Sequence, residues 1–106
     1  TSLVYVTDVV EGLMKLMAAA KDVNAVNIGS DQDLKLVEVA KMIIELTKSS
    51  AKIVFEEPLL FMTPLGLPDL TKAKERLGWI PIVTLAQGLQ KTIEYTMANK
   101  TILGMQ

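Results

Sequence analysis

The 106-residue sequence contains no cysteine and no histidine. Without cysteine the chain has no disulfide, no thiolate nucleophile and no cysteine-type zinc site, and a reducing compartment, the cytoplasm, is the expected location. Without histidine it also lacks the usual acid-base group at neutral pH and the commonest metal ligand. Any catalysis would therefore depend on Asp, Glu, Lys or Tyr with a strongly shifted pKa, or on a cofactor.

An excess of charge of one sign is also lacking. The chain has 11 Lys and Arg residues against 12 Asp and Glu residues, and the basic side chains are scattered rather than clustered. Because a basic surface is the first requirement for binding nucleic acid, neither nucleic acid nor a membrane surface is an expected partner. No apolar run reaches the ~20 residues of a membrane-spanning helix, and the N-terminal residues lack a signal-peptide pattern, so a soluble protein is expected.

The length of the chain fits one domain, and its apolar pattern predicts the elements of that domain. Apolar residues at spacings of three and four predict helices at about 9–20, 36–48, 70–77 and 85–99. Runs of strand composition predict short strands at 2–6, 25–28 and 52–57. Since a strand, helix, strand order favours parallel pairing, we predict an α/β fold: about four helices packed on a small, mainly two-stranded parallel sheet.

Two capping boxes are predicted at helix starts. Asp8 and Glu11 have the D-x-x-E spacing before the first helix, and Thr84 and Gln87 have the T-x-x-Q spacing before the last one. In each, the first side chain is expected to accept from a free backbone N–H of the first turn.

The third helix has signals at both of its ends. Asp69 can cap its start, and Gly78 suits the left-handed conformation that ends a helix. Trp79 then stands where a Schellman motif places its hydrophobic contact. The segment around Gly78 and Trp79 is therefore expected to shape the fold rather than to perform chemistry.

No spacing in the sequence indicates a cofactor or catalytic site. Gly29 follows a predicted strand but stands outside any G-x-G-x-x-G pattern, so an ordinary turn is the expected role, with a phosphate contact as the alternative. Tyr95 and Lys100 are five residues apart and cannot share a helix face as a Tyr-x-x-x-Lys pair does. We therefore assign no catalytic residue.

Acidic pairs occur at two places, Asp31 with Asp33 and Glu56 with Glu57. Hard cations require several oxygen ligands, and neither pair has a third or fourth ligand nearby in the sequence. Solvated charges are the expected interpretation, and no metal site is assigned.

Two apolar features have alternative interpretations. Tyr5 lies in a predicted strand, where its ring can pack in the core or contact a ligand. The segment LLFMTPLGLPD, residues 59–69, is apolar and interrupted by prolines, so it is expected in irregular backbone that covers a core or lines a pocket.

Three blocks of the sequence resemble a known family. They are LVYVTDVVEGLMKLM (residues 3–17), VNIGSDQDLKLVEVAKMI (26–43) and PDLTKAKERLGWIPIVTLAQGLQKTIEY (68–95). In this order and spacing they look like the C-terminal portion of NAD-dependent sugar-nucleotide epimerases and dehydratases, the extended short-chain dehydrogenases/reductases, and especially their UDP-glucuronate decarboxylase branch. The resemblance covers nearly the whole chain.

This resemblance implies a single substrate-binding lobe, residues 1–106, that belongs to a longer enzyme. The implied ligand is a nucleotide sugar, held between this lobe and a Rossmann domain that binds NAD and carries the Tyr-x-x-x-Lys pair. Neither the NAD-binding pattern nor that pair is present here, so the chain is expected to bind no cofactor and to be inactive alone. The segments expected to face the substrate are Leu3 and Tyr5 together with Thr63, Pro64, Leu65, Gly66, Leu67, Pro68 and Asp69.

The sequence departs from the family pattern at two arginines. In the family segment R-x-F-x-Y-V-x-D the arginine contacts nucleotide phosphates, and the matching position here is Thr1. The decarboxylase pattern D-D-P-x-x-R-x-P-D is matched by TPLGLPD, which is shorter and has no arginine. Since bidentate phosphate recognition depends on arginine, either the ligand differs or other groups hold its pyrophosphate.

Other functions remain open from the sequence. The main alternative is a non-catalytic interaction module that binds a protein or its own copy through the apolar loop 59–67. Binding of its own copy would make the chain a homo-oligomer. A stand-alone small-molecule binder is the third possibility.

Overall fold

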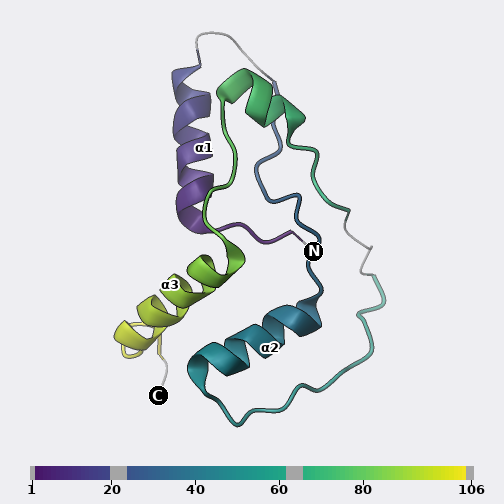
Figure 1. The fold of residues 1–106 in the computed structure, drawn as a ribbon, viewed down its shortest axis with the longest axis vertical. Coiled ribbons are helices and arrows are strands. Elements are labelled where there is room, and N and C mark those ends of the chain that lie inside the picture. Colours follow the sequence, from purple (N-terminus) through teal and green to yellow (C-terminus); the bar gives the residue numbers. More distant parts are fainter. Residues whose placement is uncertain (1, 20–23, 62–65, 105–106) are drawn as a thin grey trace.

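The computed structural model describes residues 2–19, 24–61 and 66–104. In chain order it contains α1 (Val6–Ala18), α2 (Leu36–Thr47), the short π-helix η1 (Ala73–Leu77) and α3 (Leu85–Ala98). Figure 1 shows two helix pairs, with α1 beside η1 and α2 beside α3. Among the described residues, no helix is both long and apolar enough to cross a bilayer.

The predicted two-stranded parallel sheet is wrong, because the described residues form four helices and no strand. Segments 2–5, 25–28 and 52–57, for which strands were expected, lie outside the helices. A β-branched composition favours extended backbone, but a strand also requires a neighbouring strand with which to exchange backbone hydrogen bonds. The α/β class predicted from these segments is therefore not the one observed.

Side chains hold segment 25–28 in place of a sheet ladder. The Asn27 amide donates to the Asp69 carbonyl at 3.3 Å, and the Lys72 ammonium donates to the Ala25 carbonyl at 2.9 Å. Both bonds connect this segment to the residues just before η1.

Helix α1 begins three residues before the expected position, and its predicted capping box is wrong. Tyr5 is the N-cap and makes no side-chain capping bond, while its carbonyl accepts from the Asp8 N–H at 3.0 Å. Asp8 therefore lies inside the first turn, where its side chain is buried. A carboxylate in the first turn of a helix is favoured by the helix dipole.

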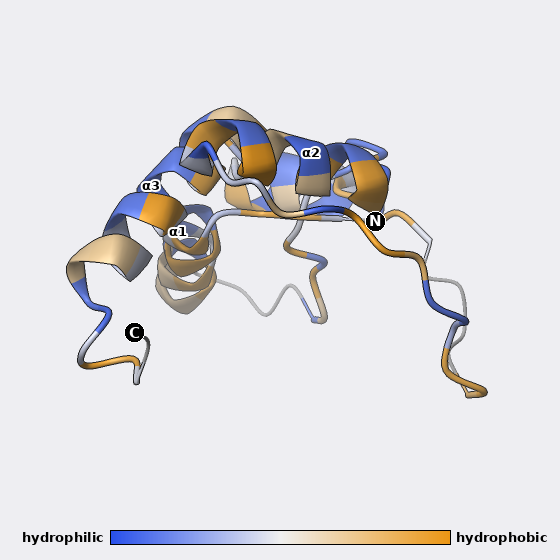
Figure 2. Cartoon of the chain, turned by 90° about the horizontal axis from the view of Figure 1, so that it is seen from below, coloured by the Kyte–Doolittle hydropathy of each residue, from blue (hydrophilic) through white to orange (hydrophobic). Residues whose placement is uncertain are grey.

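Helices α2 and α3 agree with the predicted ranges to within one residue at each end. The capping box of α3 is confirmed: Thr84 Oγ1 accepts from the Gln87 N–H at 3.2 Å, and Gln87 Oε1 accepts from the Thr84 N–H at 3.1 Å. Both helices have a hydrophobic and a hydrophilic face (Figure 2).

The end of η1 has the predicted left-handed glycine, but each of its two closing hydrogen bonds spans one residue more than in a Schellman motif. Gly78 has the left-handed φ of 63° and donates to the Lys74 carbonyl, and the Trp79 N–H donates to the Ala73 carbonyl, both at 3.1 Å. The predicted cap at Asp69 is wrong, because the N-cap residue of η1 is Lys72 and it makes no side-chain capping bond. Asp69 Oδ1 instead accepts from the Thr71 N–H at 2.9 Å, in the residues before η1.

The best-buried part of the molecule lies where α1 meets η1. Trp79 and Ala73 are 1% and 0% exposed. Gly12 of α1 allows this close approach, because a Cβ there would lie 2.9 Å from Ile28 Cδ1 and 3.2 Å from Trp79 Nε1. The joint between η1 and α3 is thus anchored on α1.

The connection after α2 runs along the outside of the molecule (Figure 1). Its apolar side chains are largely exposed, including Phe55, Leu59, Leu60 and Phe61, the last at 96%. In the described residues up to 61, this segment therefore covers no core.

Candidate functional site

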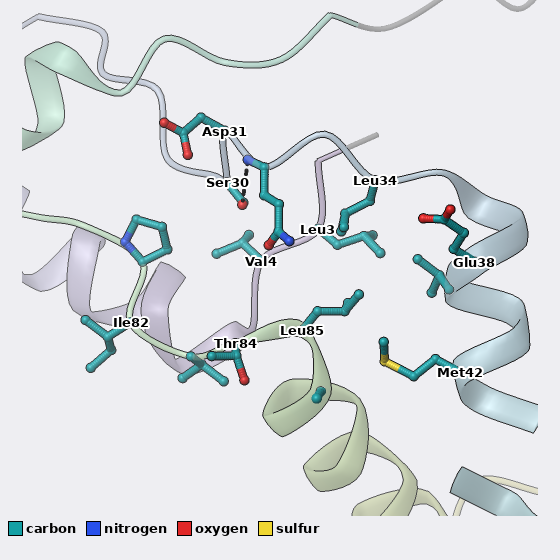
Figure 3. A pocket seen from close by; sticks show the side chains of 15 residues that line it. Leu3, Val4, Ser30, Asp31, Leu34, Glu38, Met42, Ile82, Thr84 and Leu85 are labelled. Atoms are coloured by element: carbon teal, nitrogen blue, oxygen red, sulfur yellow. Dashed lines mark hydrogen bonds between the residues drawn. The ribbon is translucent and has the colours of Figure 1, made fainter. Parts of the chain in front are cut away.

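A cavity of about 600 Å³ lies where the N-terminal segment, the loop after Gly29, the start of α2 and the 81–86 segment meet (Figure 3). Its apolar wall comes from all four of these parts of the chain, through Leu3, Leu34, Met42 and Leu85 among others. The volume is in the range of pockets that hold small molecules and cofactors.

The polar groups of this cavity are hydroxyl, amide and carboxylate groups. They come from Ser30, Asp31, Gln32, Glu38 and Thr84, and among the described residues that line the cavity none is Lys or Arg. In Figure 3, Asp31 and Glu38 lie on opposite sides of the cavity. Such a lining suits a neutral, hydroxyl-bearing ligand, because carboxylate and amide oxygens accept from hydroxyl groups while the two carboxylates disfavour an anion.

Hydrogen bonds order the loop beside this cavity. Ser2 Oγ accepts from the Ser30 N–H at 3.0 Å, and Ser30 Oγ accepts from the Gln32 N–H at 3.2 Å. Gly29 is buried just before this loop, and a Cβ there would lie 3.2 Å from both Pro68 Cγ and Ser2 Oγ. Because the space above Gly29 is filled, this glycine serves packing, and the described residues around it do not fit a dinucleotide pyrophosphate.

Leu3 and Tyr5, two of the predicted site residues, lie near the N-terminus. Leu3 lines the large cavity, and both residues line an adjoining hollow of about 190 Å³ against α3. Tyr5 also packs on Gly88, where a Cβ would lie 3.3 Å from Tyr5 Cδ1, and the Lys91 ammonium lies 5.6 Å from the centre of its ring. The ring is thus both a packing element and part of a hollow.

The predicted loop residues fall into three groups, of which the third, Pro68 and Asp69, lines a hollow described below. Thr63, Pro64 and Leu65 lie outside the described residues. Gly66 and Leu67 are exposed and belong to none of the hollows described here.

Pro68 and Asp69 line a further hollow of about 560 Å³. This hollow shares Asp31 and Pro81 with the large cavity, so the two adjoin. The fold thus brings Leu3 and the 68–69 pair to neighbouring hollows on the two sides of Asp31 and Pro81. Asp69 is exposed, and hydrogen bonds from the Thr71 hydroxyl and the Thr71 N–H lower the pKa of its carboxyl group below the ordinary value of 3.8.

Sequence reasoning missed several residues of the cavity wall. Asp31 was expected to be a solvated turn charge, and Glu38, Ile82 and Val83 were not considered, yet all of them line the cavity. No spacing could identify them, because they come from segments far apart in the sequence. Asp8 was also missed: its Oδ2 accepts from the backbone N–H groups of Ile82 and Val83, at 3.1 and 3.0 Å.

Metal chemistry finds no support in the described parts of the chain, where no group of three or more acidic residues is arranged to hold an ion. Glu56 and Glu57 are exposed in the connection after α2. Tyr95 is 62% exposed on α3.

No protein-family model matches the chain, but individual proteins do. UDP-glucuronic acid decarboxylase 1 of Xenopus tropicalis is 40% identical over 91 residues, which cover 86% of this chain and 21% of that protein. UDP-glucuronic acid decarboxylase 4 of Arabidopsis thaliana is 42% identical over 85 residues, which cover 80% of this chain and 19% of that protein. This chain therefore spans about a fifth of the length of the curated relatives it matches.

Solved structures contain the same arrangement. The Bordetella bronchiseptica enzyme WbmF in complex with NADH matches with a TM-score of 0.83 at 26% identity, over 98% of this chain and 31% of that chain. WbmF in complex with NAD+ and UDP matches with a TM-score of 0.80, over 95% of this chain and 30% of that chain. UDP-glucuronic acid 4-epimerase from Bacillus cereus, in complex with NAD, has a TM-score of 0.70 at 20% identity, over 94% of this chain and 31% of that chain, and shows likeness of fold alone.

Proposed function

We propose that this chain is the sugar-nucleotide-binding lobe, in the C-terminal portion, of a UDP-glucuronate decarboxylase-like enzyme of the NAD-dependent epimerases/dehydratases; its similarity to such proteins supports this. The observation that carries this proposal is the cavity of about 600 Å³ lined by Leu3, Asp31, Glu38 and the 81–86 segment. Its apolar wall with a few converging polar groups is typical of a small-molecule site. Pro68 and Asp69, in the adjoining hollow, complete the side of the lobe that faces the substrate.

The charges of the cavity support an assignment of the part of a nucleotide sugar that this lobe holds. A diphosphate requires cationic partners, and the described part of the chain contributes no Lys or Arg to the lining of the large cavity. The sequence also has Thr1 and the TPLGLPD segment where the family carries arginines. The lobe therefore contacts the neutral, hydroxyl-bearing part of the ligand, while cations outside this cavity hold the diphosphate.

Turnover belongs to the larger enzyme. When bound to a Rossmann domain, NAD supplies the hydride transfer of such an enzyme, and the protein positions the substrate against it. WbmF in complex with NAD+ and UDP, a structural neighbour of this chain, supports NAD and a uridine nucleotide as ligands of the parent enzyme. The 106-residue chain is expected to bind the substrate weakly and to be inactive alone.

The proposal is tested by titrating UDP-glucuronate into the isotope-labelled 106-residue chain and following its amide and methyl NMR signals. Shifts confined to the cavity residues, Leu3, Leu34, Leu85 and their neighbours, are the expected result. Leu85→Trp should fill the cavity and remove these shifts, whereas Ile102→Trp, at an 84% exposed position outside it, should not. Absence of shifts in the wild-type chain at millimolar ligand would contradict the proposal.

A second assay examines the expected inactivity. The chain is incubated with NAD and UDP-glucuronate, and the formation of UDP-xylose or reduced cofactor is measured. Turnover above the protein-free rate would show that catalytic groups are present in this chain.

The second candidate function, a self-associating or protein-binding module, is favoured by the exposed apolar side chains before residue 62. Leu59, Leu60 and Phe61 are 75%, 94% and 96% exposed. Contiguous apolar exposure of this kind often marks an interaction surface. Sedimentation at increasing concentration tests it: the candidate requires association that Leu60→Ser with Phe61→Ser reduces, and a strictly monomeric wild-type chain eliminates self-association.

A further inference from the structure

Asp8 is a buried carboxylate that the proposed function does not use. It is 2% exposed in the first turn of α1, and its Oδ2 accepts two backbone N–H groups from residues 82 and 83. Taking a carboxylate out of water costs free energy unless hydrogen bonds and nearby dipoles compensate. Here the two amides and the N-terminal end of α1 supply that compensation.

The two amides that Asp8 holds belong to the wall of the substrate cavity. Ile82 and Val83 both line the large cavity, and Val83 also lines the hollow beside Tyr5. They stand in the short link between η1 and α3, directly before the N-cap residue Thr84. Fixing them therefore also fixes where α3 begins, and with it Leu85, which lines both spaces.

The same residue is held from its other side. The Trp79 indole donates to the Asp8 carbonyl at 2.8 Å. The link between η1 and α3 therefore contacts Asp8 twice, at Trp79 near η1 and at residues 82 and 83 near α3. Between these contacts lies Pro81, which has no N–H to donate and lines both large hollows. Asp8 thus contacts the link on both sides of Pro81, through its carbonyl and through its carboxylate.

We propose that Asp8 is a positioning residue for ligand binding: its carboxylate fixes the backbone at Ile82 and Val83 and thereby sets the shape of the cavity between the N-terminal segment, α2 and α3. The inference rests on the proposed function for the identity of the ligand. The part of the inference that concerns the backbone at Ile82 and Val83 does not depend on the proposed function.

The first experiment measures the amide hydrogen exchange rates of residues 82 and 83 without a ligand. It compares the wild-type chain with Asp8→Asn and Asp8→Ala. Since hydrogen bonds to a charged group are stronger than those between neutral groups, exchange at residues 82 and 83 should rise about tenfold or more in Asp8→Ala. Asp8→Asn keeps a neutral acceptor and should show a smaller rise. Glu94→Gln removes an exposed carboxylate of α3 and should leave both amides unchanged.

A global loss of stability must be separated from a local effect. Gly78→Ala strains the end of η1 without touching the carboxylate, and it should speed exchange across the helices without singling out residues 82 and 83. If Asp8→Asn speeds exchange at Ile82 and Val83 no more than in the helices, the inference is overturned. Asp8→Asn is the deciding variant, because it keeps the size and shape of the buried side chain, whereas Asp8→Ala also leaves a cavity.

The second experiment measures affinity for UDP-glucuronate by NMR titration. Asp8→Asn should weaken binding by about threefold to thirtyfold while the helical circular dichroism and the Trp79 fluorescence stay unchanged. Equal affinity in Asp8→Asn and the wild-type chain overturns a role in binding. If the wild-type chain shows no shifts with UDP-glucuronate, the proposed function fails, and the exchange experiment still decides whether Asp8 orders the wall.

Discussion

The indole N–H of Trp79 donates a 2.8 Å hydrogen bond to the backbone carbonyl of Asp8. The two residues are 1% and 2% exposed, so the bond is shielded from water. An indole has only this one donor, and its burial beside a carbonyl acceptor meets that requirement while the ring packs between α1 and η1. The contact joins the first turn of α1 to the link that carries the cavity wall.

Replacement of Trp79 by Phe should destabilise the chain. The substitution removes the indole donor, leaves the Asp8 carbonyl without this partner and reduces the volume of the buried ring, for a loss of about 1–3 kcal/mol in the free energy of unfolding. Urea unfolding followed by circular dichroism measures it. Phe61→Leu, at a 96% exposed position, is the control and should change stability little. An unchanged midpoint for Trp79→Phe would show that the indole contact contributes nothing.

Gly12→Ala should destabilise α1 despite the higher helix propensity of alanine. A Cβ at this buried position would lie 2.9 Å from Ile28 Cδ1 and 3.2 Å from the Trp79 indole nitrogen. The Ile28 side chain can rotate, but the indole is held by its hydrogen bond, so overpacking of about 1–3 kcal/mol should exceed the propensity gain of about 1 kcal/mol.

The control for this change is Gly66→Ala, because no atom lies within 4 Å of a Cβ at Gly66. Thermal unfolding of both variants and the wild-type chain compares them. A melting temperature of Gly12→Ala at or above that of the wild-type chain would contradict close packing at Gly12.

Gly78→Ala should also lower stability, but through backbone strain alone. Gly78 has a φ of 63°, and a Cβ there would meet no atom within 4 Å. The cost is therefore the conformational one, about 1–2 kcal/mol for an L residue in the left-handed region. Gly78→Asn should lose less, since asparagine tolerates this region better. Equal unfolding midpoints for the Ala and Asn variants would argue against strain as the cause.

The carboxyl group of Asp69 should titrate below its ordinary pKa of 3.8, since the Thr71 hydroxyl and N–H stabilise its charged form. Because the pKa is lower in the folded state, this interaction stabilises the fold above pH 3.8, and the contribution is lost as the pH falls through the folded-state pKa. NMR titration of the side-chain carbonyl carbon gives the value directly.

Thr71→Val is the matched variant for this titration, because it removes the hydroxyl and keeps the backbone N–H. It should raise the pKa of Asp69 toward the ordinary value without abolishing the shift. A wild-type midpoint at or above 3.8 would show that the Thr71 contact does not stabilise the carboxylate.

Local signals in the sequence located the helices well. The T-x-x-Q spacing of Thr84 and Gln87 predicts the start of α3, and Gly78 predicts the end of η1. Both predictions are confirmed. These motifs involve residues within six positions of one another, so the chemistry that stabilises them can be read from the sequence. The capping box at Asp8 failed because a long-range partner, the 82–83 backbone, takes its carboxylate.

The cavity was predictable only in part. Leu3 was expected in the site from family resemblance, and the structure places it in the wall of the cavity, together with Asp31 and Glu38, which were not expected there. Asp31 and Glu38 carry no local pattern that separates a cavity carboxylate from a solvated one. Only their positions across the folded chain make that distinction.

The sequence by itself determined the periodicity of α1, α2 and α3, the capping box of α3 and the glycine that ends η1, because these depend on interactions within a few turns of backbone. Tertiary structure decided that the strand-like segments stay outside any sheet in the described residues and that the Asp8 carboxylate accepts from residues 82 and 83. An extended segment forms a sheet only when a second strand lies beside it to exchange backbone hydrogen bonds. The hydrogen-bond donors of a buried carboxylate are likewise fixed only when segments distant in the sequence pack together. For this reason the lining of the cavity and the absence of a strand from the described residues follow from packing rather than from composition.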